Sequence, residues 1–193
     1  MQRVCVFCGS NPGTGEAYVA AADALGAAIA RAGLGLVYGG GSVGLMGRVA
    51  GAALAAGGEV HGVIPSSMEQ RELAHVGVTK LYVVPSMHAR KAKMSELSSA
   101  FVALPGGFGT LEELFEVLTW AQLGIHQKPI GLLDVEGYWA PLVDFIERAI
   151  DIGFVRPEYR QLFTYATTPE QLLQALREHV PLDLPRWLEP SET

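Results

Sequence analysis

Short apolar runs alternate with longer amphipathic stretches along the whole chain. The apolar runs predict strands at Arg3–Cys8, Leu34–Tyr38, Glu59–Ile64, Lys80–Val84, Ala100–Leu104, Pro129–Leu133 and Leu162–Ala166. The stretches between them repeat apolar residues at helical spacing and predict helices at Glu16–Ala32, Gly44–Ala56, His88–Leu97, Leu111–Leu123, Tyr138–Ile152 and Pro169–His179. Strands that are apolar on both sides and alternate with helices are typical of a parallel sheet covered on both faces. We therefore expect an α/β fold with a doubly wound, Rossmann-like, mostly parallel sheet of about seven strands and helices on both faces.

The length and composition of the chain fit one domain with a substantial core. It has 193 residues, 49% of them hydrophobic and 18% charged, and no shift in composition marks an internal boundary. We expect a single Rossmann-like domain over residues 1–180. Residues 181–193 contain Pro181, Pro185 and Pro190 and are expected to form a C-terminal tail.

The charge balance restricts the partners. A net charge of −6 and an isoelectric point near 5.3 argue against non-specific nucleic-acid binding and against an anionic membrane surface, so any anion site must be local. No apolar run approaches the ~20 residues of a membrane span, and the first predicted strand follows Met1 too closely for a signal peptide. We expect a cytoplasmic protein with a small-molecule substrate, no nucleic-acid partner and no membrane association.

The two cysteines, Cys5 and Cys8, form a Cys-x-x-Cys pair that raises the question of redox or metal chemistry. Both lie in the first predicted strand, where residues three apart point to opposite faces. A redox pair needs its first cysteine at a helix N-terminus, and a zinc site needs two further ligands nearby. We therefore expect two reduced, buried thiols and no metal site.

A glycine-rich loop, Gly39–Gly47, follows the second predicted strand. Its glycines satisfy G-x-G-x-x-G, but the acidic residue of a dinucleotide site should end the next strand, and Glu59 begins it instead. We interpret the loop, including Gly40 and Gly41, as a backbone cradle for part of a nucleotide or sugar phosphate. The alternative is a tight turn that packs helix closely against strand.

A basic pair, Arg90 and Lys91, follows Ser86, which is a candidate helix N-cap. Cations in the first helical turn oppose the helix dipole, and an anion bound there by the helix N-terminus and Arg90 would account for them. The alternative is a solvated basic turn paired with Glu96. His88 is expected to have a packing or surface role.

The segment Pro105–Glu113 carries the strongest chemical signal. It joins the apolar run Ala100–Leu104 to a helical pattern, and a glycine-rich turn at that place directs backbone N–H groups and a helix dipole at a phosphate. Glu112 and Glu113 bring carboxylates beside it. Thr110 and Glu113 also fit a capping box, which needs no catalysis, but simple capping does not require three glycines.

These three segments together resemble the LONELY GUY family. The resemblance rests on Gly-Gly-Gly-x-x-Gly-Leu-Met-Gly (39–47), Met-His-x-Arg-Lys (87–91), Pro-Gly-Gly-x-Gly-Thr-x-Glu-Glu (105–113) and the continuation Leu118–Gly124. Members of this family are cytokinin riboside 5′-monophosphate phosphoribohydrolases, long mislabelled as lysine decarboxylases. The resemblance implies a homodimeric, cofactor-free protein that hydrolyses the N-glycosidic bond of an N6-modified AMP into free base and ribose 5-phosphate.

By position, the resemblance makes Arg90 and Glu113 the catalytic pair. The residues expected to bind substrate are Gly40, Gly41, Glu72, Arg90, Lys91, Gly107, Phe108, Gly109, Thr110, Leu111, Glu112, Glu113 and Thr119. A decarboxylase would need a lysine Schiff base to pyridoxal phosphate, and neither Lys91 nor Lys93 carries a sign of that role. A broad AMP nucleosidase and a non-catalytic nucleotide or cofactor carrier remain the alternatives.

Overall fold

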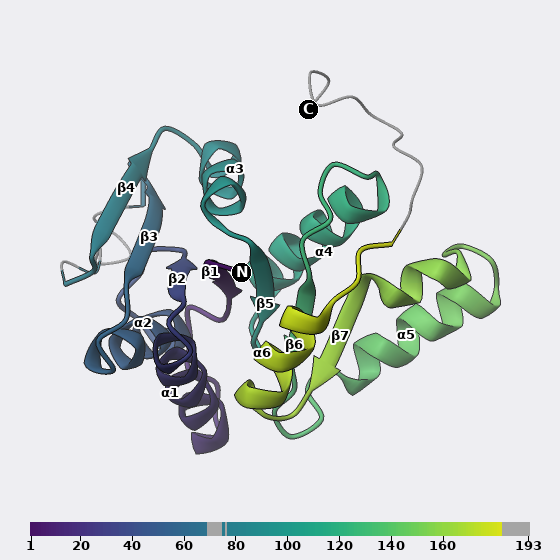
Figure 1. Cartoon of the computed structure of the whole chain (residues 1–193), viewed down its shortest axis with the longest axis horizontal. Helices are drawn as coiled ribbons and strands as arrows, with labels where there is room; N and C mark the ends of the chain where they lie inside the picture. The colour runs from purple at the N-terminus through teal and green to yellow at the C-terminus, as the bar shows by residue number, and fades with distance from the viewer. Residues whose placement is uncertain (69–74, 76, 183–193) are drawn as a thin grey trace.

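The computed structural model of the chain describes residues 1–68, 75 and 77–182. Within these residues, seven strands form one parallel sheet in the order β4-β3-β2-β1-β5-β6-β7 (Figure 1). The strands are β1 (Arg3–Phe7), β2 (Gly35–Tyr38), β3 (Val60–Pro65), β4 (Lys80–Val84), β5 (Ala100–Ala103), β6 (Ile130–Leu133) and β7 (Phe163–Ala166). The predicted Rossmann-like fold class is confirmed.

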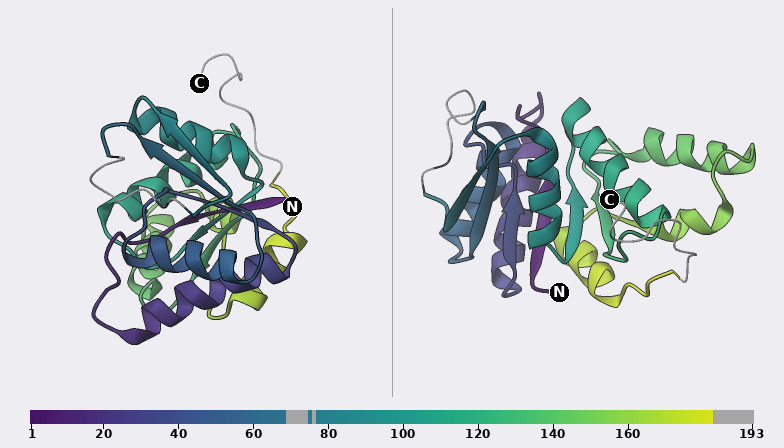
Figure 2. Two further views of the ribbon diagram at one scale, coloured as in Figure 1. Left: turned by 90° about the vertical axis from the view of Figure 1, so that its left-hand side faces the viewer. Right: turned by 90° about the horizontal axis from the view of Figure 1, so that it is seen from above.

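Helices cover both faces of the sheet (Figure 2). The helices are α1 (Glu16–Arg31), α2 (Gly44–Ala55), α3 (Met87–Leu97), α4 (Phe108–Gln122), α5 (Ala140–Asp151) and α6 (Pro169–Glu178), with a 3₁₀ turn η1 (Pro157–Leu162) before β7. Apolar residues of α1, α2 and α6 share one core cluster, and those of α3, α4 and α5 pack on the other. Cys5 and Cys8 are free, buried and in opposite clusters, as predicted.

The small residues of α1 and α2 pack these two helices against each other. A Cβ on Gly26 of α1 would lie only 2.2 Å from the Val49 carbonyl oxygen of α2. The absent side chain therefore lets the two backbones approach closely.

The strand order reverses between β1 and β5, which are neighbours in the sheet but are separated by three strands in the chain. Ligands of open parallel sheets bind outside the carboxyl ends of the strands at such a switch point. The loop Gly9–Thr14 follows β1 there, and the loop Leu104–Gly107 follows β5.

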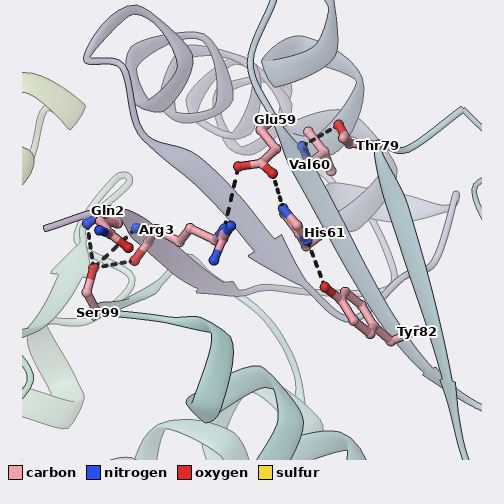
Figure 3. Close-up of polar contacts among 8 residues, drawn as sticks. All are labelled: Gln2, Arg3, Glu59, Val60, His61, Thr79, Tyr82 and Ser99. Atoms are coloured by element: carbon pink, nitrogen blue, oxygen red, sulfur yellow. Dashed lines mark hydrogen bonds and ion pairs between the residues drawn. The ribbon is translucent and has the colours of Figure 1, made fainter.

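The opposite, amino edge of the sheet carries a polar cluster (Figure 3). Glu59, just before β3, contacts the His61 Nε2 atom through Oε1 at 2.7 Å and the Arg3 Nε atom through Oε2 at 3.5 Å. His61 Nδ1 lies 3.4 Å from the Tyr82 hydroxyl of β4. This cluster joins the starts of β1 and β3 to the middle of β4, and it lies at the edge where no ligand site is expected.

No helix among the described residues is long and apolar enough to cross a membrane. The cytoplasmic location stays a prediction. The division into a domain over residues 1–180 and a tail over 181–193 also stays a prediction, because residues 183–193 lie outside the described part of the chain.

Candidate active site

Two neighbouring cavities lie at the carboxyl ends of β1 and β5. The first, called here the Arg90 cavity, is about 270 Å³ and is lined by Cys8, Gly9, Ser10, Met46, Met68, Met87, Arg90, Gly107, Phe108, Gly109, Thr110, Glu112 and Glu113. The second, called the Tyr138 cavity, is about 350 Å³ and is lined by Gly9, Ser10, Asn11, Pro12, Gly13, Thr14, Tyr18, Leu45, Pro105, Gly106, Gly107 and Tyr138. Because Gly9, Ser10 and Gly107 line both, the cavities are two halves of one crevice at the switch point.

Arg90 is held in place by backbone groups from two other elements. It lies in the second turn of α3, whose N-cap Ser86 accepts a hydrogen bond from the Ala89 N–H at 3.1 Å, as predicted. The Arg90 side chain is buried, and it donates through Nε to the Val63 carbonyl at 3.1 Å and through Nη2 to the Gly39 carbonyl at 3.0 Å. The interpretation of Arg90 as part of a solvated turn is therefore wrong.

The remaining guanidinium nitrogen of Arg90 is the one that faces the crevice. Its Nη1 atom lies 3.8 Å from the Met87 sulfur and 3.9 Å from Glu113 Oε1. The contact with Glu113 is too long for a hydrogen bond, and the Met87 thioether is a weak acceptor. Arg90 thus has a fixed position and one donor nitrogen with room for a ligand.

Glu113 is a buried carboxyl group with a strongly shifted pKa. It is 9% exposed on α4. Burial raises its pKa to about 7, and the charge of Arg90 only partly opposes that shift. A carboxyl group with a pKa near the operating pH can both accept and donate a proton, which is the property of a general acid–base catalyst.

The capping-box interpretation of Glu113 is wrong because α4 begins three residues earlier than predicted. The N-cap is Gly107, in an extended conformation and with no side-chain hydrogen bond. Thr110 is therefore the third residue of the helix and Glu113 the sixth, beyond the reach of the cap. Glu113 serves no purpose at the helix start, which strengthens its candidacy as a reacting group.

The start of α4 presents to the Arg90 cavity backbone N–H groups that have no acceptor within the helix. The helical hydrogen bonds begin with the Leu111 N–H, which donates to the Gly107 carbonyl at 3.1 Å. The N–H groups of the three residues before Leu111 have no acceptor within the helix. A Cβ on Gly107 or Gly109 would meet no atom within 4 Å, so packing does not require these two glycines. They leave the entrance to these donors unobstructed, as an anion site requires.

Lys91 is not free to bind an anion in this structure. Its ammonium group forms ion pairs with Glu112 and, at 2.8 Å, with Glu116, both on α4. Glu96 pairs with Lys93 at 2.8 Å and with neither Arg90 nor Lys91. The alternative interpretation, a basic turn paired with Glu96, is therefore wrong. Lys91 joins α3 to α4 beside the crevice and does not line either cavity.

Several predicted binding residues lie outside both cavities. Gly40 and Gly41 are buried, and a Cβ on Gly40 would lie 3.2 Å from the Ile64 Cβ. Leu111 packs against the apolar core, and the Thr119 hydroxyl donates to the Phe115 carbonyl at 2.7 Å. Glu72 lies outside the described residues.

The Gly39–Gly47 loop makes the contacts of a tightly packed turn. A Cβ on Gly39 would lie 2.0 Å from Arg90 Nη2, and one on Gly44 would lie 2.2 Å from the Ser10 carbonyl oxygen. The glycines therefore allow Arg90 and the β1 loop to reach this backbone. Whether Gly40 and Gly41 also touch a ligand stays a prediction.

Sequence reasoning missed the loop after β1 and Tyr138. The loop begins Gly9-Ser10-Asn11-Pro12-Gly13, a cluster of turn residues directly after a strand, and this signal could have been recognised. Tyr138 carries no local signal for a site. Among the described residues, no group of three or more His, Cys, Asp or Glu side chains is arranged to hold a metal ion.

Comparisons with known proteins agree on one family. Residues 46–176 match the family described as "Possible lysine decarboxylase". A probable cytokinin riboside 5′-monophosphate phosphoribohydrolase of Oryza sativa subsp. japonica is 51% identical over 93% of this chain and 74% of its own length. A cytokinin riboside 5′-monophosphate phosphoribohydrolase of Arabidopsis thaliana is 48% identical over 93% of this chain and 84% of its own length.

Solved structures with the same fold include cofactor-binding proteins. The molybdenum cofactor carrier protein of Chlamydomonas reinhardtii superposes with a TM-score of 0.69 at 26% identity, covering 92% of this chain and 98% of its own. The molybdenum cofactor binding protein of Rippkaea orientalis gives a TM-score of 0.69 at 22% identity, covering 92% of this chain and 97% of its own, and this likeness supports the fold alone.

Proposed function

The chain belongs to the LONELY GUY family of cytokinin riboside 5′-monophosphate phosphoribohydrolases, and on that premise we propose that it hydrolyses the N-glycosidic bond of an adenosine 5′-monophosphate that carries an N6 substituent. The products are the free base and ribose 5-phosphate. The observation that carries the proposal is the buried Glu113–Arg90 pair, which faces the same cavity as the open N-terminus of α4.

Glu113 supplies the acid–base chemistry in this proposal. Cleavage of the bond between C1′ and the base nitrogen develops positive charge on the ribose, which a nearby carboxylate stabilises. Water adds to C1′ as the bond to the base breaks. Glu113 takes the proton of that water and returns it toward the departing base, for which a pKa near 7 is suited.

The 5′-phosphate binds at the start of α4 in this proposal. The unpaired N–H groups of the first helical turn and the positive end of the helix dipole favour a dianion there. Binding energy from the phosphate, which is remote from the broken bond, then helps to place C1′ against Glu113. Arg90 holds its fixed position, supports the ionised form of Glu113 and keeps Nη1 directed toward the ligand.

The direct test is chromatography of AMP and isopentenyl-AMP after incubation with the protein. We expect free base and ribose 5-phosphate in equal amounts, with the ratio of the two rates separating an N6-selective enzyme from a broad AMP nucleosidase. If neither nucleotide yields free base while both bind tightly, the enzyme proposal is overturned.

A non-catalytic carrier is the second candidate, because the Chlamydomonas reinhardtii cofactor carrier shares the fold at 26% identity. A carrier would use the glycine loop and the helix N-terminus. It would gain nothing from a buried carboxyl group beside a bound anion, since the ionised form repels the ligand. Tight nucleotide binding that is improved by Glu113→Gln, without turnover in the wild type, is the result that would favour the carrier.

We infer further that the protein is a homodimer whose interface lies beside the crevice. Phe108 and Phe115, which lie on the same side of α4, are 93% and 41% exposed, and Phe108 lines the Arg90 cavity. Phe145 on α5 is 66% exposed. Exposed aromatic residues are enriched at interfaces between proteins. Sedimentation should give twice the chain mass for the wild type and a monomer for Phe115→Glu, and a monomeric wild type would contradict this inference.

A further inference from the structure

Tyr138 contacts the phosphate-binding loop from a segment that no recognised motif includes. It lies between β6 and α5, and its hydroxyl donates a hydrogen bond to the Gly106 carbonyl. We propose that Tyr138 is a positioning residue that sets the direction of the Gly106–Gly107 peptide, and with it the amides that receive the substrate's phosphate. This inference rests on the proposed nucleotide site.

The turn that carries Tyr138 is fixed by a buried carboxylate. Asp134, at the end of β6, accepts hydrogen bonds from the Gly137 N–H at 2.9 Å and from the Trp139 N–H at 2.8 Å. Trp139 is fully buried and donates its indole N–H to the Leu133 carbonyl at 3.2 Å. Glu136 has a φ of 53°, which is unusual for a residue other than glycine. The turn is thus held in one conformation by contacts on both sides of Tyr138.

The ring of Tyr138 is partly exposed and contacts two other aromatic rings. It meets the Trp139 ring edge to face at a centroid distance of 4.9 Å and the Tyr18 ring at 6.4 Å. These ring contacts do not involve the hydroxyl. A phenylalanine at position 138 would keep them and lose only the bond to Gly106.

The contacts of the neighbouring residues do not set the direction of the Gly106–Gly107 peptide. The Gly9 N–H donates to the Pro105 carbonyl at 3.1 Å, which fixes the preceding peptide. A Cβ on Gly106 would lie 2.1 Å from the Thr110 Oγ1 atom, so Gly106 fits only as glycine. Glycine permits many backbone directions, and the bond from Tyr138 selects one of them.

The direction of this peptide matters for the site. In a trans peptide the carbonyl and the N–H point in opposite directions, so a Gly106 carbonyl held by Tyr138 also fixes the N–H of Gly107. Gly107 lines both halves of the crevice and is the N-cap of α4. Its N–H therefore joins the donors of the first helical turn at a set angle.

The test compares Tyr138→Phe with Tyr82→Phe, the same change at the amino edge of the sheet. Calorimetric binding of AMP and of adenosine, which lacks the phosphate, separates a phosphate effect from general damage. Tyr138→Phe should weaken AMP binding by about three- to tenfold, the effect of one lost hydrogen bond. Adenosine binding should stay unchanged, the melting temperature should fall by only a few degrees, about the effect of one hydrogen bond, and Tyr82→Phe should bind both ligands as the wild type does.

Equal loss of AMP and adenosine binding, or no loss of either, would overturn the role of Tyr138. Calorimetric binding of ribose 5-phosphate should weaken in parallel with AMP binding, since it carries the same phosphate. These measurements need no turnover. If the wild type binds AMP and isopentenyl-AMP but releases base from neither, the proposed reaction fails, but a selective effect of Tyr138→Phe on AMP binding would still support this inference.

Discussion

The two edges of the sheet each hold a glutamate paired with a cation, and the two glutamates have opposite pKa shifts. At the amino edge, the pKa of Glu59 lies below its usual value, first because His61 donates a hydrogen bond to it and also because Arg3 is close. At the carboxyl edge, burial raises the pKa of Glu113 to about 7 although Arg90 is near. The ionised form of the half-exposed Glu59, which has a short contact with His61, is stabilised. The ionised form of the buried Glu113, which has a long contact with Arg90, is disfavoured.

The difference supports the proposal that the catalytic site lies at the carboxyl edge. A carboxylate that is costly to ionise at neutral pH is a poor structural element, and such groups cluster at functional sites. Glu113 also faces unpaired backbone donors and an open cavity, whereas Glu59 joins the starts of the strands (Figure 3). The following predictions test this contrast, from the largest expected effect to the smallest.

The largest effect is expected on turnover. Glu113→Gln keeps the size of the side chain and removes its proton chemistry, so kcat should fall by about 10²–10⁴-fold. Glu59→Gln is the matched control at the other edge and should leave kcat within about twofold of the wild type, because surface ion pairs contribute little. The measurement is the rate of base release from isopentenyl-AMP. A fully active Glu113→Gln protein would remove the basis for the catalytic assignment.

The next effect is on folding through Arg90. Arg90→Met removes two hydrogen bonds to the carbonyls of Val63 and Gly39 and leaves Glu113 without its cation. The free energy of unfolding should fall by about 2–4 kcal/mol. Lys93→Met, on the same helix, removes a surface ion pair with Glu96 and a cation–π contact with the Tyr82 ring, and it should change the free energy of unfolding by less than about 1 kcal/mol. Urea denaturation measures the free energy of unfolding of both variants. Equal losses for the two would contradict the structural role of Arg90, which is to join α3 to the carbonyls of Val63 and Gly39.

The sheet and its covering helices could be predicted because their signal is local. Each strand is a short run buried on both sides, so the apolar pattern alone located all seven to within about two residues. The start of α4 was set three residues late for a physical reason: Thr110 has the side chain of a typical N-cap, while the true cap, Gly107, acts through its backbone alone.

The site was predicted in part because its residues lie in three compact segments. The sequence singled out Arg90 and Glu113, and their catalytic role stays a prediction, but the bonds that fix Arg90 come from residues 27 and 51 positions away in the chain. The contact from Tyr138 to Gly106 spans 32 positions and exists because β6 lies beside β5. Such contacts depend on the packed topology, which no local pattern encodes.

Glu113→Gln should also stabilise the protein at alkaline pH. The folded-state pKa of Glu113 is raised above its unfolded value, so wild-type stability falls as the pH rises from about 4.5 to above 7. Glutamine removes that loss, and the variant should be more stable at pH 8 by roughly 1–3 kcal/mol. The advantage should disappear below about pH 4.5, where the carboxyl group is protonated in both states. Chemical unfolding of the variant and the wild type at pH 8 and below pH 4.5 tests this. If the two proteins differ in their free energy of unfolding by the same amount at both pH values, titration of Glu113 is not the cause.

The smallest effect is expected at Glu59, and it should have the opposite dependence on pH. Its folded-state pKa is lowered, so its contribution is present above the unfolded pKa and is lost as the pH falls through the folded value. Because the side chain is 46% exposed, Glu59→Gln should cost less than about 1 kcal/mol at pH 7. The cost should shrink as the pH falls below the usual pKa of a glutamate and the wild-type carboxylate becomes protonated. Urea unfolding of the Glu59→Gln and Glu113→Gln proteins over the same pH range should give differences in the free energy of unfolding from the wild type that have opposite signs. Differences of the same sign would contradict the contrast between the two edges.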